Sequence, residues 1–165
     1  MRYRRLLSIA SLLLLAVACS RAATAQRPNV PVEDSIRDAR QRWNRAVEGR
    51  DTSEFRSLLS GTYYSASGAG HISGADSAVV FAARLFARRP DLLFQARPTR
   101  IRALAGHGLA SEFGEWVERW REPSGLTELR GTYYALWRRQ SGSWLIEGEV
   151  NAPESCTGSD YCKAR

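Results

Sequence analysis

Apolar residues in the first half of the chain recur at steps of three and four, the spacing that gathers side chains on one face of a helix. The clearest run covers residues 32–48, where Arg37, Arg40 and Arg45 are expected to lie largely on the solvated side. Its apolar members are Ile36, Ala39, Trp43, Ala46 and Val47. Gly49 follows, so we expect the helix to end there.

Two more helices are expected before the middle of the chain ends. Asp51, with Glu54 three positions later, resembles a capping box and introduces a short apolar face before Gly61. That face consists of Phe55, Leu58 and Leu59. After the strand-like run TYYSAS and a glycine-rich bend, Ser73 is placed to cap a third helix that stops before Pro90.

Beyond Pro90 the pattern changes to four strand-like runs separated by turn residues. The runs are FQARPTRIRALAG, GLASEFGEWVERWRE, TELRGTYYALWRR and SWLIEGEV. Short turns between consecutive runs predict an antiparallel meander that curls over the helices, so the order of the elements indicates an α+β fold. Within this meander Pro98 is tolerable only at a sheet edge or in a bulge.

The alternation along these runs also predicts which side chains face the helices, because successive strand residues point to opposite faces. We assign the set of small and aromatic residues to the inner face. It comprises Ala110, Glu112, Gly114, Trp116, Glu118 and Trp120 in the second run, Gly131, Tyr133, Ala135 and Trp137 in the third, and Trp144, Ile146, Gly148 and Val150 in the fourth. Trp137 and Trp144 are expected to close the core, whereas Tyr133 and Val150 are expected to line a cavity.

Three segments carry a resemblance to a known family. They are the helix pattern WNRAVEGRDTSEFRSLL, the aromatic strand TYYS with the glycine turn after it, and the closing pair GTYYALWRRQSGSWLIEGEV. Together, over residues 32–151, they resemble the nuclear-transport-factor-2-like superfamily, and within it the SnoaL-like branch catalogued as domain of unknown function 4440.

The resemblance implies a cone, in which a curved antiparallel sheet wraps on three N-terminal helices and leaves a cavity between them. This is the cystatin-like or nuclear-transport-factor-2-like architecture. Members include ketosteroid isomerases, polyketide cyclases, dehydratases and many proteins without known catalysis, so the fold alone does not choose a function. We expect Tyr63, Trp43, Trp116 and Trp137 to contribute to ligand binding in the cavity.

Glu112 is the unusual residue of the inner face, because a carboxylate between Ala110 and Gly114 is costly unless it is paired or hydrated. Tyr133 is a candidate partner. Such a carboxylate could abstract a proton beside a carbonyl while the tyrosine hydroxyl stabilises the enolate oxygen. The alternative is that Glu112 lies at the wet mouth of the cone or on the solvent face and has no catalytic role.

The N-terminus has the composition of a secretory signal, because the basic residues MRYRR precede the apolar run LLSIASLLLLAVA. The run is shorter than an ordinary membrane span. Cleavage after Ala25 would make residues 1–25 the signal peptide and residues 26–31 a linker. Alternatively LAVAC resembles a lipobox, in which case the signal covers residues 1–18 and Cys19 is lipidated. Both interpretations predict export, as a periplasmic protein or as a lipoprotein anchored through its lipid.

The amino-acid composition limits the classes of molecule that this chain is expected to bind. The formal net charge is +7, but removal of residues 1–25 takes away four arginines and no acid, which leaves 20 basic against 17 acidic residues, a net charge of +3. The remaining arginines are interspersed with acids, so no nucleic-acid partner is expected. No cofactor is expected either, and the separated residues His71 and His107 do not predict a zinc site.

Two cysteines remain after the signal, Cys156 and Cys162, in a C-terminal tail of residues 152–165. An even pair in an oxidising compartment predicts a disulfide. Because the loop between them is short, the bond is expected to fix the tail more than to stabilise the whole fold.

Two functions stay open at this point. The favoured one is an exported domain that binds a small apolar molecule in its cone and pairs with a second copy through the outer face of the sheet. That outer face carries Phe113, Val117, Tyr134 and Leu136. The alternative is a cofactor-free isomerase, cyclase or dehydratase that uses Glu112 with Tyr133 or Tyr63.

Overall fold

The computed structural model describes residues 31–68 and 70–163. The predicted signal peptide over residues 1–25, including Cys19, and nearly all of the predicted linker lie outside the described residues. No helix of the described part is long and apolar enough to cross a membrane.

Three helices form in the predicted regions: α1 (Val32–Glu48), α2 (Thr52–Ser57) and α3 (Ala75–Arg88). The second ends earlier than predicted, because Leu58 is its C-cap and Leu59 already begins a strand. The Asp51 carboxylate accepts a hydrogen bond from the backbone nitrogen of Glu54 at 2.9 Å, as the capping pattern predicts. The predicted cap of the third helix is wrong, because Gly74 holds the N-cap position and makes no side-chain cap. The position predicted for Arg40 is also wrong, since this side chain is fully buried.

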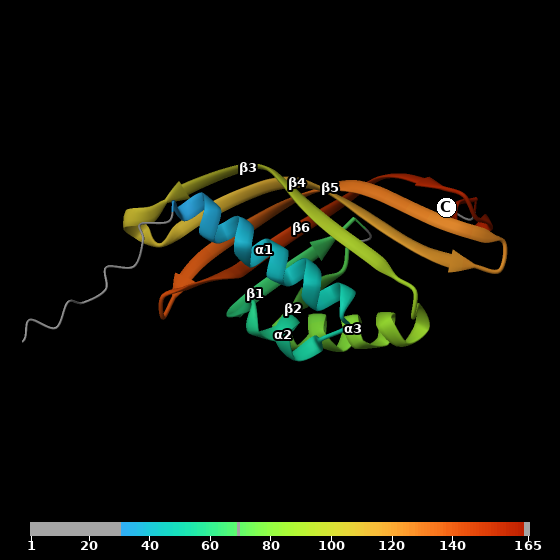
Figure 1. The fold of residues 1–165 in the computed structure, drawn as a ribbon, viewed down its shortest axis with the longest axis horizontal. Helices are drawn as coiled ribbons and strands as arrows, with labels where there is room; N and C mark the ends of the chain where they lie inside the picture. Colours follow the sequence, from blue (N-terminus) through green and yellow to red (C-terminus); the bar gives the residue numbers. More distant parts are fainter. Residues whose placement is uncertain (1–30, 69, 164–165) are drawn as a thin grey trace, which may run out of the picture.

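The strands form one sheet in the order β2-β1-β6-β5-β4-β3. Their bounds are β1 (Leu59–Ser67), β2 (Ile72–Gly74), β3 (Leu93–Leu104), β4 (Leu109–Glu122), β5 (Gly125–Gln140) and β6 (Ser143–Thr157). The last four strands are the predicted antiparallel meander. β1 adds to it in parallel beside β6, which the alternation did not predict. Figure 1 shows the long strands as a curved sheet arching over α1, with α2 and α3 on the same side.

The edge strand β3 is fixed to helix α1 and carries the predicted irregularity. The amide of Asn44 accepts from the backbone nitrogen of Ala96 at 3.0 Å and donates to its carbonyl oxygen at 2.9 Å. The register against β4 shifts between Pro98 and Arg100. Pro98 therefore occupies both positions that proline tolerates in a sheet, an edge strand and a bulge.

A second bulge, in β6, reverses the predicted facing of that strand's end. Trp137 pairs with Ile146 and its neighbour Leu136 pairs with Gly148, so Glu147 is an extra residue in β6. Such an insertion shifts the alternation by one position. The prediction that Val150 lines the cavity is consequently wrong: its side chain is 44% exposed, whereas that of Glu149 turns inward and is 6% exposed.

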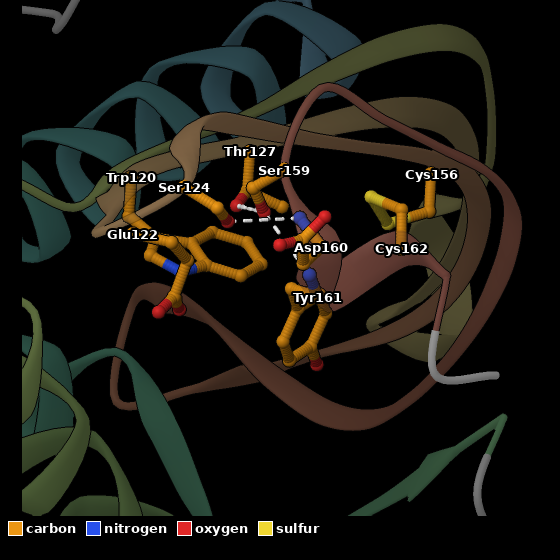
Figure 2. Close-up of a disulfide and its surroundings, with 9 residues drawn as sticks. All are labelled: Trp120, Glu122, Ser124, Thr127, Cys156, Ser159, Asp160, Tyr161 and Cys162. Atoms are coloured by element: carbon orange, nitrogen blue, oxygen red, sulfur yellow. Dashed lines mark hydrogen bonds between the residues drawn. A yellow bond between two sulfur atoms is a disulfide. The ribbon is translucent and has the colours of Figure 1, made fainter.

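The segment predicted as a tail continues the fold. β6 runs to Thr157, past the predicted domain end at residue 151, and the short helix η2 (Asp160–Cys162) follows. Cys156 and Cys162 form a disulfide, and the Tyr161 ring packs edge-on against Trp120 with centroids 5.0 Å apart (Figure 2). The chain end therefore folds back onto the inner face of β4.

Candidate functional site

The described residues line a partly open cavity of about 460 Å³ between the concave face of the sheet and the three helices. Most of its wall is apolar. The apolar lining residues are Trp43, Val47, Phe55, Ala78, Phe81, Ala82, Leu85, Phe86, Leu92, Phe94, Trp116, Leu129 and Pro153. Polar groups enter at a few points: Tyr63, Ser65, Ser67, His71, Arg89, Glu118, Glu149, Asn151 and Tyr161. A largely apolar cavity with a few polar groups is the usual form of a small-molecule site.

Three of the predicted ligand-binding residues meet at this cavity. Trp43 comes from α1, Tyr63 from β1 and Trp116 from β4, and all three line the wall. Phe94 connects the two tryptophans: its ring lies edge-on to Trp43 at 5.4 Å and stacks on Trp116 at 5.7 Å. The aromatic wall therefore joins helix α1 to β3 and β4, the two strands at one edge of the sheet.

Glycines in β4 and β5 allow the aromatic rings to lie flat against the sheet. A Cβ atom added to Gly131 would lie 2.7 Å from the Trp116 ring, and one added to Gly114 would lie 2.4 Å from the Tyr133 ring. Both distances are too short for a real contact, so each glycine is required by the ring across from it. The indole nitrogen of Trp116 also donates to the Thr132 carbonyl oxygen at 3.0 Å, which fixes the orientation of the ring.

Three other predicted site residues, Glu112, Tyr133 and Trp137, lie outside this cavity, in a buried polar network. Glu112 faces inward and is fully buried, and the Tyr133 hydroxyl donates to its Oε1 atom. The Trp137 indole nitrogen donates to Oε2 of the same carboxylate at 2.6 Å. None of these three side chains lines the cavity. The prediction of Tyr133 and Trp137 as cavity residues is therefore wrong, although the predicted pairing of Tyr133 with Glu112 is present.

Arg40 joins this network to the cavity. Its Nε atom donates to Glu112 at 3.0 Å, and its Nη2 atom donates to Oε2 of Glu149 at 2.9 Å. Burial acts to lower the pKa of Arg40, but Glu149 and Glu112 outweigh this effect and raise the pKa above its ordinary value. The guanidinium therefore stays charged inside the core.

Aromatic rings complete the surroundings of the guanidinium. Its carbon atom lies 4.8 Å from the ring centre of Tyr133, 5.2 Å from that of Trp43 and 5.3 Å from that of Trp137. The electron-rich ring faces favour a cation at this distance. The Nη1 atom has no hydrogen-bond partner among the described residues. Arg40 is not part of the cavity wall, so this atom is not offered to a ligand.

Glu149 is the member of the network that reaches the cavity. Its Oε1 atom accepts a hydrogen bond from the Asn151 amide at 3.1 Å, while Arg40 holds the other oxygen. Burial raises the pKa of the neighbouring Tyr63, and the negative charge of Glu149 raises it further. A carboxylate held in this way can accept a hydrogen bond or a proton from a bound molecule.

Sequence reasoning missed Glu149 and Arg40 for different reasons. The bulge that turns Glu149 inward has no signature in the run SWLIEGEV. Arg40, by contrast, lies four residues after Ile36 and three before Trp43, so the helix period itself places it on the apolar face. A basic residue at such a position indicates a buried anionic partner.

The opposite end of the cavity carries a second ion pair. Arg89, just after α3, donates to Glu118 of β4 at 3.1 Å, and its guanidinium lies 3.6 Å from the ring centre of Trp120. Tyr161 from η2 lines the same end. The C-terminal segment therefore forms part of the wall. In the described part of the chain no group of three His, Cys, Asp or Glu side chains is arranged to hold a metal ion.

Comparison with known proteins was made at the levels of sequence and of structure. No protein-family model and no curated protein matches the chain by sequence. A nuclear-transport-factor-2-like protein from Cytophaga hutchinsonii ATCC 33406 matches in structure with a TM-score of 0.62 and 12% identity, over 76% of this chain and 100% of that chain.

Two further solved structures carry names of enzymes. A putative scytalone dehydratase from Novosphingobium aromaticivorans DSM 12444 matches with a TM-score of 0.70 and 10% identity, over 76% of this chain and 86% of that chain. A type 3 hexachlorocyclohexane dehydrochlorinase from Novosphingobium barchaimii LL02 matches with a TM-score of 0.66 and 15% identity, over 76% and 88%. At these identities the likeness shows a shared fold. The chain thus has the cone-shaped fold of the nuclear-transport-factor-2-like superfamily, as its sequence resemblance predicted.

Proposed function

We propose that this chain is an exported small-molecule-binding protein that holds an apolar ligand in the cavity beneath its curved sheet. The observation that carries the proposal is the cavity of about 460 Å³ with its aromatic and aliphatic wall. Ligand sites in proteins typically have a volume of about 300–1,000 Å³ and a mostly apolar lining. A core that served packing alone would be filled to close-packed density.

Export is supported by the N-terminal sequence. The basic and apolar segments of residues 1–25 have the order of a secretory signal, and a disulfide such as Cys156–Cys162 persists in oxidising compartments. The mass of the mature protein distinguishes export as a soluble protein from export as a lipoprotein. A chain that begins at Gln26 is soluble, whereas one that begins at a lipid-modified Cys19 is anchored. A cytoplasmic chain that keeps residues 1–18 would contradict export.

Ligand binding is tested by filling the cavity from helix α3. Ala82 lines the cavity, whereas its neighbour Ala83 is exposed on the other side of the same helix. We expect Ala82→Phe to reduce binding of the neutral dye Nile red about tenfold or more, because the added ring occupies the space of the ligand. The matched variant Ala83→Phe is expected to bind the dye as the wild type does.

Nile red binding by the wild type and the two variants is measured by fluorescence titration. Equal dye binding by the wild type and Ala82→Phe would show that the dye lies elsewhere on the molecule. A wild-type protein that binds no dye would leave the cavity without a ligand-binding role. Thermal melting of each variant verifies that the added phenylalanine has not unfolded the chain.

A second candidate function, a cofactor-free enzyme that works by general acid–base chemistry, is favoured by the Glu149 carboxylate in the cavity wall. The names of two structural neighbours, a putative dehydratase and a dehydrochlorinase, belong to lyase-type enzymes and agree with this candidate. The pair predicted for this chemistry, Glu112 with Tyr133, is sealed from the cavity. In this second candidate Glu149 is the base and the Tyr63 hydroxyl the donor beside it.

The two candidate functions predict different behaviour of Glu149→Gln. The protein is incubated with a small-molecule extract of its host, and new products are sought by mass spectrometry. Products formed by the wild type and absent with Glu149→Gln, while dye binding is retained, would favour the enzyme. An extract left unchanged by the wild-type protein would favour the binding protein.

A further inference from the structure

The two ends of the cavity differ in charge balance. At one end, Glu118 is paired with Arg89. At the other, Glu149 and Glu112 share the single guanidinium of Arg40. Across the described residues, no second cationic side chain forms an ion pair with either of these two carboxylates. The buried network therefore places two carboxyl groups on one guanidinium.

This imbalance is unfavourable in the core when both carboxyl groups are ionised. Glu112 is fully buried and Glu149 nearly so, and charges removed from water are stabilised only when they are paired. The hydrogen bonds from Tyr133, Trp137 and Asn151 spread the charge but do not cancel it. A cation delivered through the cavity would cancel it, and Glu149 is the carboxylate that such a cation can reach.

The carboxylate oxygens of Glu149 can still accept hydrogen bonds from a cationic ligand. An ionised carboxylate accepts about four hydrogen bonds in total. Oε2 accepts from Arg40 and Oε1 accepts from Asn151, so each oxygen keeps a lone pair, and the residue lines the cavity. An ammonium group has three donors and no acceptor, which suits this surface. An anionic ligand would be repelled by the same carboxylate.

We propose that the cavity selects apolar molecules that carry a cationic amine, with the amine on Glu149 and the apolar body against the wall of Trp43, Phe94 and Trp116. The inference rests on the proposed ligand-binding function and specifies its ligand class. The ammonium–carboxylate contact is charge-assisted, and such bonds are stronger than neutral ones, the more so at a carboxylate as little exposed as that of Glu149.

The test compares three indole compounds that share an apolar body and differ in the end group: tryptamine, tryptophol and indolepropionate. Their binding to the purified wild-type protein is measured by isothermal titration calorimetry. We expect tryptamine to bind about tenfold more tightly than tryptophol, which is the size of effect expected for one charge-assisted hydrogen bond in place of a neutral one. Indolepropionate is expected to bind most weakly.

Two variants test whether Glu149 is the source of the preference for the amine. Glu149→Gln is expected to bring the affinities for tryptamine and tryptophol within about twofold of each other, because the charge is gone while a hydrogen-bond acceptor remains. Glu147→Gln is the matched control: this residue lies two positions earlier in β6 and pairs with Arg138. It is expected to keep the full preference for the amine.

Wild-type protein that binds tryptophol or indolepropionate as tightly as tryptamine would overturn the inference, and this comparison does not depend on the folding of any variant. A preference for the amine that persists in Glu149→Gln would also overturn it. Failure of the underlying function is separately visible, because in that case neither Nile red nor any of the three indoles would bind.

Discussion

At the scale of single residues, Arg40 is the side chain on which the interior of the cone depends. It connects helix α1 to β4 through Glu112 and to β6 through Glu149, elements that are distant in sequence. Replacement of a whole buried ion network by apolar residues is often neutral, whereas removal of one partner is costly, because it leaves an uncompensated buried charge. The network therefore fixes the position of α1 on the sheet more than it adds stability.

Arg40→Met tests this role, since it keeps the length of the side chain and removes its charge. We expect the variant to lower the free energy of unfolding by about 3–5 kcal/mol, because two buried carboxylates lose their cation. Arg37→Met, on the exposed side of the same helix, is the control and is expected to change stability by less than about 0.5 kcal/mol. The measurement is urea unfolding followed by tryptophan fluorescence. An equally small effect of both variants would contradict the network's role.

At the scale of elements, the structure shows where alternation predicts facing and where it fails. In β4 and β5 the predicted inner residues, among them Trp116 and Trp137, are all on the inner face, because the pairing of these two strands is regular over its full length. In β6 the prediction holds up to Ile146 and fails after the bulge at Glu147. A bulge depends on pairing with the neighbouring strand, so the sequence of β6 alone does not reveal it.

The facing of β6 is tested by the same substitution on both sides of the bulge. Ile146 is fully buried before it, and Val150 is exposed after it. We expect Ile146→Thr to lower the free energy of unfolding by about 2–4 kcal/mol, because it removes apolar volume and buries a hydroxyl. Val150→Thr is expected to change it by less than about 0.5 kcal/mol. The original prediction, with both residues inward, requires comparable losses in urea unfolding.

At the scale of the whole molecule, the sequence predicts the architecture better than the site. Local sequence patterns predict the helices, the four-strand meander and the bulge at Pro98. These elements are enough to predict a cone-shaped fold. The cavity, in contrast, is bounded by residues as distant as Trp43, Ala82 and Tyr161. Its position depends on how the helices and the C-terminal segment pack against the sheet. No local sequence pattern predicts that packing. For this reason the predicted catalytic pair was found in the core but outside the cavity.

The sequence predicts that two chains pair through the outer face of the same sheet. Phe113 is partly exposed there and packs against Tyr134 with ring centroids 4.6 Å apart. We propose that this face pairs two chains, and we expect Leu136→Arg to give a monomer, because a buried unpaired charge at an interface is strongly unfavourable. Ala83→Arg, on the exposed side of α3, should leave the dimer intact. Light scattering measures the mass, and a monomeric wild type or a dimeric Leu136→Arg would contradict the proposal.

The most direct test of the account is a nuclear magnetic resonance titration of the five tryptophan indole N–H signals with tryptophol. Tryptophol is neutral, so the result does not depend on the charge of the ligand. If the ligand enters the cavity, the signals of Trp43 and Trp116 shift. The signal of Trp137 does not shift, because its indole N–H is buried and donates to Glu112. A shift of Trp137 without shifts of Trp43 and Trp116 would place the ligand at the predicted catalytic pair and contradict the cavity as the functional site.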